Sequence, residues 1–148
     1  MLNVHLRINE DGRPVPCFVR LETAGTERFP LGYGVNDSER VISLEPTTQT
    51  VGYHFAAIDG GCEVSLPPGP VRVQAKRGPL YEPLDVVHTL AAGKLALRFA
   101  LSRRADWRSR GWYSGDLRVH RLTPHGVLAQ AAAEDLDFVQ LLVRDGES

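Results

Sequence analysis

One stretch of the sequence decides the fold of this chain, and it reads Gly111-Trp112-Tyr113-Ser114-Gly115-Asp116-Leu117-Arg118-Val119-His120-Arg121. Apolar and polar residues alternate from position 116 to position 120, which is typical of a strand with two different faces. A strand here would place a carboxylate, a guanidinium and an imidazole on one face, from Asp116, Arg118 and His120. The residues before the stretch are typical of an antiparallel sandwich, and the residues after it are typical of a helix followed by a strand.

The composition limits the classes of partner. The chain has 148 residues, of which 43% are hydrophobic and 24% charged, and its formal net charge is -1. A nearly neutral chain has no bulk attraction for polyanions, so we expect no nucleic-acid partner. No apolar run approaches the roughly 20 residues that cross a bilayer, and the N-terminus lacks the apolar core of a secretion signal. We therefore expect no membrane partner and a cytoplasmic location.

The first hundred residues are predicted to form an antiparallel β-sandwich. Short segments of alternating apolar and polar residues recur between turn residues, with no helical pattern among them. Residues 22–53 are predicted to be a long loop region that contains a single strand. The strands expected in this part of the chain are 4–8, 15–21, 40–44, 53–56, 62–66, 71–76, 84–90 and 95–101.

Two hairpins are predicted within this sandwich. We expect residues 4–8 to pair with 15–21 across the turn at Asp11-Gly12, because the two segments are short, alternating and close in sequence. We expect residues 62–66 to pair with 71–76, because both present apolar residues to the same side.

The pattern changes after Leu101. Residues 102–110 carry four arginines and Trp107, and they are predicted to be a solvated linker whose tryptophan packs on the sandwich, with an anion-binding patch as the alternative. Thr123 followed by Pro124 is typical of a helix start, and apolar residues then recur at helical spacing. Residues 137–143 are predicted to be a buried strand. Strand, helix and strand in this order indicate one β-α-β unit of a parallel sheet or barrel.

Three carboxylates lie where this helix is expected to end. They are Glu134, Asp135 and Asp137. Because they stand between a helix and a strand, we expect them to cap the helix and to be solvated.

Two parts of the chain resemble known families. Residues 12–101 resemble a carboxypeptidase-regulatory-like, or prealbumin-like, domain. The resemblance lies in Gly12-Arg13-Pro14-Val15-Pro16 and in Gly61-Cys62-Glu63-Val64-Ser65-Leu66-Pro67-Pro68-Gly69-Pro70-Val71-Arg72-Val73. The opening stretch and Ala133-Glu134-Asp135-Leu136-Asp137 resemble the start of the catalytic barrel of the CehA/McbA-like metallohydrolases, which belong to the PHP superfamily. In those proteins a small β-sandwich similarly precedes the barrel.

The resemblance implies a division of the chain and a chemistry. It implies a sandwich at 1–101, a linker at 102–110 and an incomplete PHP barrel at 111–148. The family's barrel is a distorted β/α barrel that binds divalent metals and hydrolyses phosphoesters or, in some members, carboxylic esters and amides. One helix and two parallel strands cannot close such a barrel, so this part of the chain resembles a fragment of it.

The metal motif of the family is matched in part. Two histidines at i and i+2 of a strand project from one face and can bind a zinc-class ion that generates hydroxide near neutral pH. His120 matches the second histidine and Asp116 the aspartate that orients or supplements the ligands. Arg118 stands in place of the first histidine, and arginine stays protonated and has no lone pair for a metal. The candidate ligands for zinc or manganese are therefore His120 and Asp116, in a degenerate motif.

No catalytic residue is assigned from the sequence. The expected function is a non-catalytic accessory β-sandwich module from the N-terminal part of a PHP-type metal-dependent hydrolase. The alternative is a hydrolase whose site is completed by oligomerisation or by a missing C-terminal barrel. Exposed strand edges in the incomplete β-α-β unit predict either self-association or pairing with such a barrel.

Overall fold

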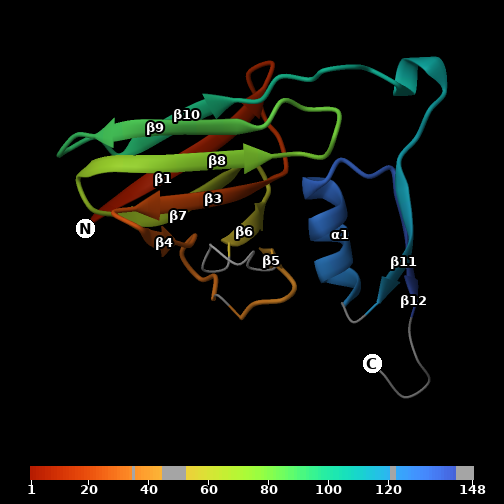
Figure 1. The fold of residues 1–148 in the computed structure, drawn as a ribbon, viewed down its shortest axis with the longest axis horizontal. Helices are drawn as coiled ribbons and strands as arrows, with labels where there is room; N and C mark the ends of the chain where they lie inside the picture. Colours follow the sequence, from red (N-terminus) through yellow and green to blue (C-terminus); the bar gives the residue numbers. More distant parts are fainter. Residues whose placement is uncertain (35, 45–52, 121–122, 143–148) are drawn as a thin grey trace.

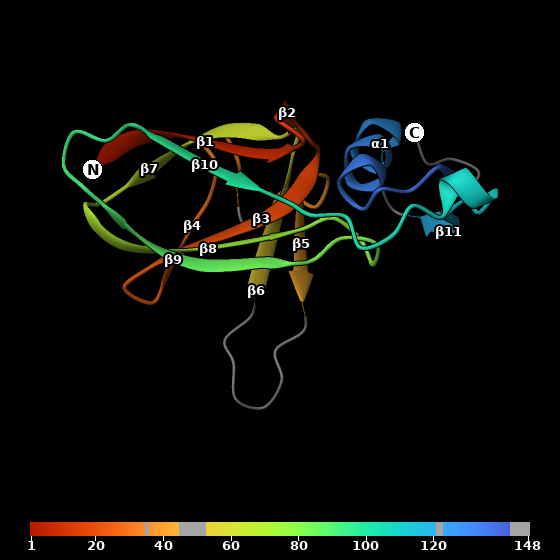
Figure 2. The same ribbon diagram turned by 90° about the horizontal axis from the view of Figure 1, so that it is seen from above.

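The fold is a two-layered β-sandwich with a small β-α-β unit at one end, as Figure 1 and Figure 2 show. The computed structural model describes residues 1–34, 36–44, 53–120 and 123–142, with the backbone alone at 44 and 117–120. The predicted fold class, mainly β with a short C-terminal β-α-β unit, is confirmed. In the described ranges, no helix has the length and apolar character needed to cross a membrane.

The two layers of the sandwich are a four-stranded and a six-stranded sheet. The smaller sheet contains β1 (Leu2–Glu10), β2 (Arg13–Pro14), β7 (Gly61–Leu66) and β10 (Ala96–Ala100). The larger sheet contains β3 (Cys17–Thr23), β4 (Thr26–Arg28), β5 (Val41–Leu44), β6 (Tyr53–Ile58), β8 (Gly69–Lys76) and β9 (Leu84–Leu90).

The core lies between the two sheets and consists of the inward-facing residues of alternating strands. In β1, Val4, Leu6 and Ile8 are each 0% exposed, because every second residue of a strand points to the same side. Val71 and Val73 of β8 meet them from the larger sheet and belong to the same buried cluster. The period-two pattern therefore predicted correctly which of these side chains are buried.

The first predicted hairpin is wrong, because β1 and β3 lie in different sheets. The chain does turn back along β1, but only Arg13 and Pro14 pair with it. The Val15 N–H donates to the Ile8 carbonyl at 3.0 Å, and the next residue, Pro16, has no N–H with which to continue the ladder. The chain then crosses to the larger sheet, where β3 pairs with β6 and β8.

The second predicted hairpin is also wrong. β7 pairs with β1 in the smaller sheet, whereas β8 pairs with β3 and β9 in the larger one. Pro67 and Pro68 lie at the corner between them and provide no N–H for a hairpin ladder. The two strands face each other across the core, so both still present their apolar residues inward.

The region predicted as a loop contains more order than expected. The predicted strand at 40–44 is confirmed as β5. The short strand β4 was missed, and it pairs with the end of β3 through a tight turn at Ala24 and Gly25. Both turn residues have positive φ, 48° and 78°, as a type I′ hairpin requires. Residues 45–52 lie outside the described residues.

The predicted strand, helix and strand are confirmed as β11 (Gly115–His120), α1 (Pro124–Ala133) and β12 (Phe138–Leu142). The expected burial of the last strand is wrong, because Phe138 and Leu142 are 50% and 46% exposed. β11 and β12 pair in parallel, as a β-α-β unit requires. The Thr123 hydroxyl oxygen caps the helix by accepting the Gly126 N–H at 3.2 Å, and Pro124 occupies the first turn. The linker contains one 3-10 turn, η1 (Arg108–Arg110).

Gly60 gives a test of the crossing between β6 and β7. Its φ is 89°, and an added Cβ would lie 2.6 Å from the Val15 backbone nitrogen. We expect Gly60→Ala to lower the free energy of unfolding by about 3 kcal/mol, because left-handed strain and a backbone clash add together. Urea unfolding measures this change.

The matched control is Gly25→Ala. Gly25 has a similar φ of 78°, but an added Cβ would meet nothing within 4 Å. Its cost should be limited to about 1 kcal/mol of backbone strain. Equal losses for the two variants would contradict the close packing at Gly60.

Candidate functional site

The predicted metal residues lie near opposite ends of β11. Asp116 is the second residue of the strand and His120 is the last. Asp116 pairs with Val139 and His120 with Leu142, with a register shift between Asp116 and Val119. β11 therefore has one residue more than β12 over this interval, which is a β-bulge. The prediction of one shared polar face assumed unbroken alternation, and the alternation is interrupted here.

The spacing along β11 also disfavours one shared ion. A strand rises about 3.3 Å per residue, so Asp116 and His120 are separated by about 13 Å of strand. Zinc–ligand bonds are about 2 Å long, and side chains that stand perpendicular to a strand do not converge over such a distance. The side chains of Arg118 and His120 lie outside the described residues, so metal binding at His120 stays a prediction.

The described donor set does not fit a metal ion by itself. Among the residues that the structure describes, no group of three or more histidine, cysteine, aspartate or glutamate side chains is placed to hold a metal. Structural and catalytic zinc sites take at least three protein ligands. The described residues therefore do not complete a metal site of this kind.

The arginines of the linker meet a buried carboxylate, Asp135, at the end of α1. Asp135 is 8% exposed and has a φ of 59°. It ends the helix in a Schellman arrangement, in which the Leu136 N–H donates to the Ala131 carbonyl at 2.9 Å. Aspartate is one of the few residues that adopt this left-handed conformation readily. The prediction that Asp135 is solvated is therefore wrong.

Three arginines from separate segments surround Asp135. Arg77 Nη2 lies 2.8 Å from Oδ1, Arg108 Nη2 lies 2.9 Å from Oδ1, and Arg103 Nη1 lies 3.8 Å from Oδ2. Arg77 follows β8, Arg103 follows β10, and Arg108 lies in η1. We call Asp135 and these three arginines the Asp135 network.

This network attaches the β-α-β unit to the sandwich. Arg77 also donates to the Pro16 carbonyl at 2.7 Å and to the Ala132 carbonyl at 2.5 Å, so one side chain joins the start of β3 to the end of α1. A cation at the carboxyl end of a helix also interacts favourably with the helix dipole. A buried carboxylate without such partners would cost several kcal/mol, so the network fixes where α1 ends against the sandwich.

A second carboxylate extends the network into the sandwich. Arg103 Nε lies 3.2 Å from Oε1 of Glu10 in β1. The Tyr81 hydroxyl, which is buried, hydrogen-bonds to Glu10 and accepts from Arg103. Burial acts to raise the pKa of Glu10, but the hydrogen bonds from Tyr81 and Arg103 outweigh it and hold the pKa below its usual value.

The linker is largely exposed, as a solvated connector should be, but three of its four arginines are paired with carboxylates. Arg104 pairs with Glu82 at 2.8 Å, and Arg108 pairs with Asp137 at 2.5 Å in addition to Asp135. The charges of these arginines are matched by carboxylates of the same chain. The alternative of an anion-binding patch loses most of its basis for the same reason, because Arg110 alone among the four has no carboxylate partner in the described part of the chain and lies against the Trp107 ring.

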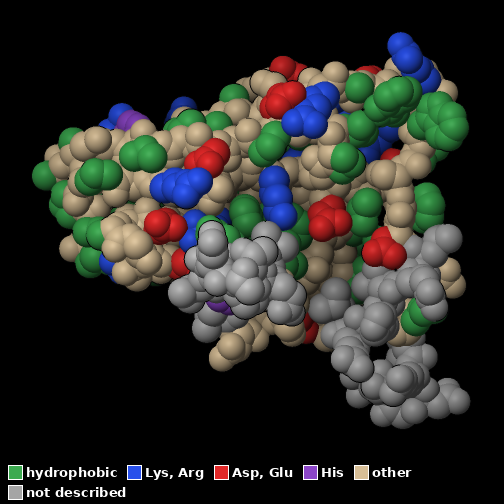
Figure 3. All heavy atoms as spheres, viewed as in Figure 1, with side chains coloured by type: hydrophobic (Ala, Val, Ile, Leu, Met, Phe, Trp, Pro, Cys, Tyr) green, Lys and Arg blue, Asp and Glu red, His purple; other side chains and the backbone are tan. Residues whose placement is uncertain are grey.

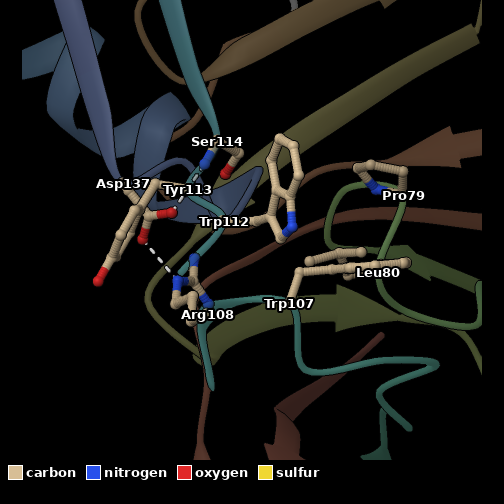
Figure 4. Close-up of a pocket in the computed structure, with 8 residues that line it drawn as sticks. All are labelled: Pro79, Leu80, Trp107, Arg108, Trp112, Tyr113, Ser114 and Asp137. Carbon is tan, nitrogen blue, oxygen red and sulfur yellow. Dashed lines mark hydrogen bonds and ion pairs between the residues drawn. The ribbon is translucent and has the colours of Figure 1, made fainter. Parts of the chain in front are cut away.

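A cavity of about 350 Å³ lies beside this network, where the linker meets the turn after β8. Its walls are aromatic and aliphatic side chains, from Pro79, Leu80, Trp107, Trp112 and Tyr113. We call this space the aromatic cavity. Figure 4 shows the Trp112 indole standing opposite Trp107, Leu80 and Pro79. The predicted packing of Trp107 on the sandwich is thus incomplete, because 43% of its surface is exposed.

One end of the aromatic cavity is polar. Asp137, Arg108 and Ser114 lie there, and Asp137 Oδ2 accepts the Ser114 N–H at 2.9 Å. The backbone hydrogen bond from Ser114, followed by the hydrogen bond from Arg108, lowers the pKa of Asp137. Asp137 therefore stays ionised and holds Arg108 at this end of the cavity.

The aromatic cavity lies at the amino ends of β11 and β12, since Ser114 precedes Gly115 and Asp137 precedes Phe138. His120 lies at the carboxyl end of β11. The cavity and the predicted metal position are therefore at opposite ends of the β-α-β unit. The sequence indicates Trp107 but not the cavity, whose only local signal is three aromatic residues within positions 107–113.

The Asp135 network predicts how firmly the β-α-β unit is attached. We expect Asp135→Asn to weaken that attachment by about 3 kcal/mol, because three buried or half-buried arginines lose their shared anion. Asparagine keeps the size of the side chain and tolerates positive φ, so the change isolates the charge. Amide hydrogen exchange should become about a hundredfold faster in α1 and β12 and stay unchanged in β1, β3 and β8.

The control for this variant is Glu82→Gln. The Glu82–Arg104 pair is largely exposed, and such pairs contribute about 0.5 kcal/mol. Exchange in α1 should therefore stay close to that of the unmodified protein. If exchange in α1 of Asp135→Asn stays as slow as in the unmodified protein, apolar contacts alone hold the unit in place.

Glu10 gives a prediction for acid pH. Its pKa is lower in the folded than in the unfolded chain, so its contribution to stability is present above about pH 4.3 and is lost as pH falls through the folded pKa. Urea midpoints measured from about pH 6 to about pH 3 should fall less steeply for Glu10→Gln than for the unmodified protein. Glu63→Gln, at an exposed position of β7, serves as the control. Parallel curves for Glu10→Gln and the unmodified protein would refute this contribution.

Comparison with protein-family models, with curated proteins and with solved structures finds no match for this chain. The resemblance to the CehA/McbA-like metallohydrolases therefore stays a prediction.

Proposed function

We propose that the chain is a non-catalytic accessory module of a PHP-type metal-dependent hydrolase. In this proposal the sandwich holds the first strand–helix–strand unit of a catalytic barrel in place. The observation that carries it is the parallel β11-α1-β12 unit, which is joined to the sandwich by buried charges at Asp135. The main core of the sandwich lies between its two sheets, so the sandwich does not need a parallel unit to bury its own apolar residues.

The uncovered surface of the β-α-β unit supports this role. Phe138 and Leu142 of β12 are 50% and 46% exposed, and Leu128 of α1 is also exposed. Strands of parallel sheets are ordinarily buried on both faces. The later strands of a barrel, parallel to β11 and β12, and the helices that connect them are the partner of matching chemistry for these side chains.

The position of His120 is consistent with the same proposal. In β/α barrels the catalytic groups lie at the carboxyl ends of the strands, and His120 is the last residue of β11. Arg118 occupies the position at which the family's motif has its first histidine, and arginine cannot bind a metal. The described part of the chain supplies no further ligand cluster, so we expect no activity from the module alone.

Metal content and hydrolysis test the proposal. The purified protein, incubated with zinc or manganese and desalted, should retain less than one metal ion per chain when measured by plasma mass spectrometry. It should not hydrolyse 4-nitrophenyl phosphate or 4-nitrophenyl acetate faster than buffer with the same metal. One tightly held ion per chain, lost in His120→Ala and kept in His125→Ala, together with hydrolysis, would instead establish the complete hydrolase.

The degenerate motif has a complementary test. Arg118→His creates two histidines at i and i+2, so zinc affinity should rise above that of the unmodified protein. Adding His120→Ala to this variant should remove the gain, whereas adding His125→Ala should not. Absence of any gain in Arg118→His would contradict the derivation of β11 from a metal-binding strand.

A further inference from the structure

Three exposed aromatic residues of the chain gather at the aromatic cavity. Trp107, Trp112 and Tyr113 are 43%, 68% and 67% exposed, and all three line it. Figure 3 shows hydrophobic atoms gathered at the upper right of the molecule, where Figure 1 draws η1 and the chain leading to β11. Single exposed apolar residues are ordinary, but several around one cavity mark a binding surface.

The walls of the cavity are held by the backbone before any ligand binds. The Trp112 N–H donates to the Trp107 carbonyl at 3.0 Å, and the Gly111 N–H donates to the Arg108 carbonyl at 3.0 Å. The Arg110 guanidinium lies 5.6 Å from the centre of the Trp107 ring, which braces that indole. Binding to a preformed site avoids the entropic cost of ordering it.

The polar end of the cavity offers hydrogen bonds without a net charge. The Asp137 carboxylate is paired with Arg108, so a charged ligand would find no uncompensated partner there. Asp137 accepts from Arg108 Nε and from the Ser114 N–H, which leaves about two of the four acceptor positions of a carboxylate. The ligand that fits this end is neutral and carries hydrogen-bond donors on one edge.

We propose that the aromatic cavity binds a neutral sugar ring, as one residue of a glycan. A pyranose has a flat face of C–H groups, which packs on an indole, and an edge of hydroxyl groups, which both donate and accept. It therefore matches the aromatic walls and the Asp137 end together. This site is separate from the predicted metal position and does not depend on the proposed hydrolase relationship.

Other ligands match only part of the cavity. A hydrocarbon chain would match the aromatic walls, but it would leave unused the acceptor positions of Asp137 that Arg108 and Ser114 do not fill. A proline-rich peptide would stack on the aromatic rings, but proline has no N–H to donate to Asp137. A nucleotide would stack as well, but at the polar end of the cavity its phosphates would meet Arg108, whose charge is already matched by Asp135 and Asp137.

Tryptophan fluorescence tests this proposal directly. The chain has two tryptophans, Trp107 and Trp112, and both line the cavity, so the whole tryptophan emission reports on it. Titration with neutral oligosaccharides built from glucose, xylose or N-acetylglucosamine should give a saturable change in emission for at least one of them. No saturable change with any of the three would overturn the proposal.

Variants establish that binding occurs in the cavity. By calorimetry, which does not depend on the fluorophore, Trp112→Ala and Tyr113→Ala should each weaken binding of the oligosaccharide about tenfold. Both side chains are mainly exposed, so both variants should fold, and circular dichroism checks this. Val87→Ala, at a 69% exposed position of β9 away from the cavity, should bind as the unmodified protein does.

Two results would contradict the sugar site. Equal affinities for Trp112→Ala, Tyr113→Ala and Val87→Ala would place any sugar binding elsewhere. Saturable, Trp112-dependent binding of a polyproline peptide or of adenosine monophosphate, without binding of the oligosaccharides, would assign the cavity to another ligand class. Neither result involves metal or hydrolysis, so failure here is distinguishable from failure of the accessory-module proposal.

Discussion

The burial of Asp135 is the constraint on which the arrangement of the two parts of the molecule depends. A carboxylate that is 8% exposed is stable only where cations reach it, and here they come from the ends of β8 and β10 and from η1. The apolar contribution of α1 is small, since its buried residues are Gly126, Val127 and Ala133. The buried charges and one small apolar cluster, in which Ala133 packs with Phe18 and Phe55, together determine where the β-α-β unit lies.

The same arginines connect the attachment to the aromatic cavity. Arg108 binds Asp135 on the sandwich side and Asp137 at the polar end of the cavity. Asp137 in turn holds the backbone of Ser114, the residue before β11. The cavity is thus built from the groups that place β11 and β12, which explains why its walls are fixed although its aromatic rings are exposed.

The sequence predicted local features well and long-range pairings poorly. Alternation identified Val4, Leu6 and Ile8 as buried, and Thr123 with Pro124 located the start of α1, because these signals lie within a few residues. Alternation is the same whichever sheet a strand joins, so it could not show that β1 and β3, or β7 and β8, lie in opposite sheets. The prolines at 16, 67 and 68 mark these crossings once the pairing is known.

The candidate site was harder to predict for two physical reasons. The Asp135 network joins residues that are 58, 32 and 27 positions apart, and ion pairs at such separations leave no periodic pattern. Asp135 also adopts a left-handed conformation where glycine is usual, so its position gave no sign of burial. The bulge in β11 could not be predicted either. The sequence alternates without a break from position 116 to 120, although β11 has one residue more than β12 over this interval.

The place of β1 in its sheet has a consequence for how the chain acquires its structure on the ribosome. β1 is made before the other strands of its sheet, yet it pairs in parallel with β10, from His5 opposite Ala96 to Asn9 opposite Ala100. Its other neighbour, β7, begins at Gly61. The sandwich therefore cannot close until about a hundred residues have emerged, and such distant contacts make folding slow. Arg77 and Arg103 are in position only at that stage, so we expect α1 to join a sandwich that has already folded.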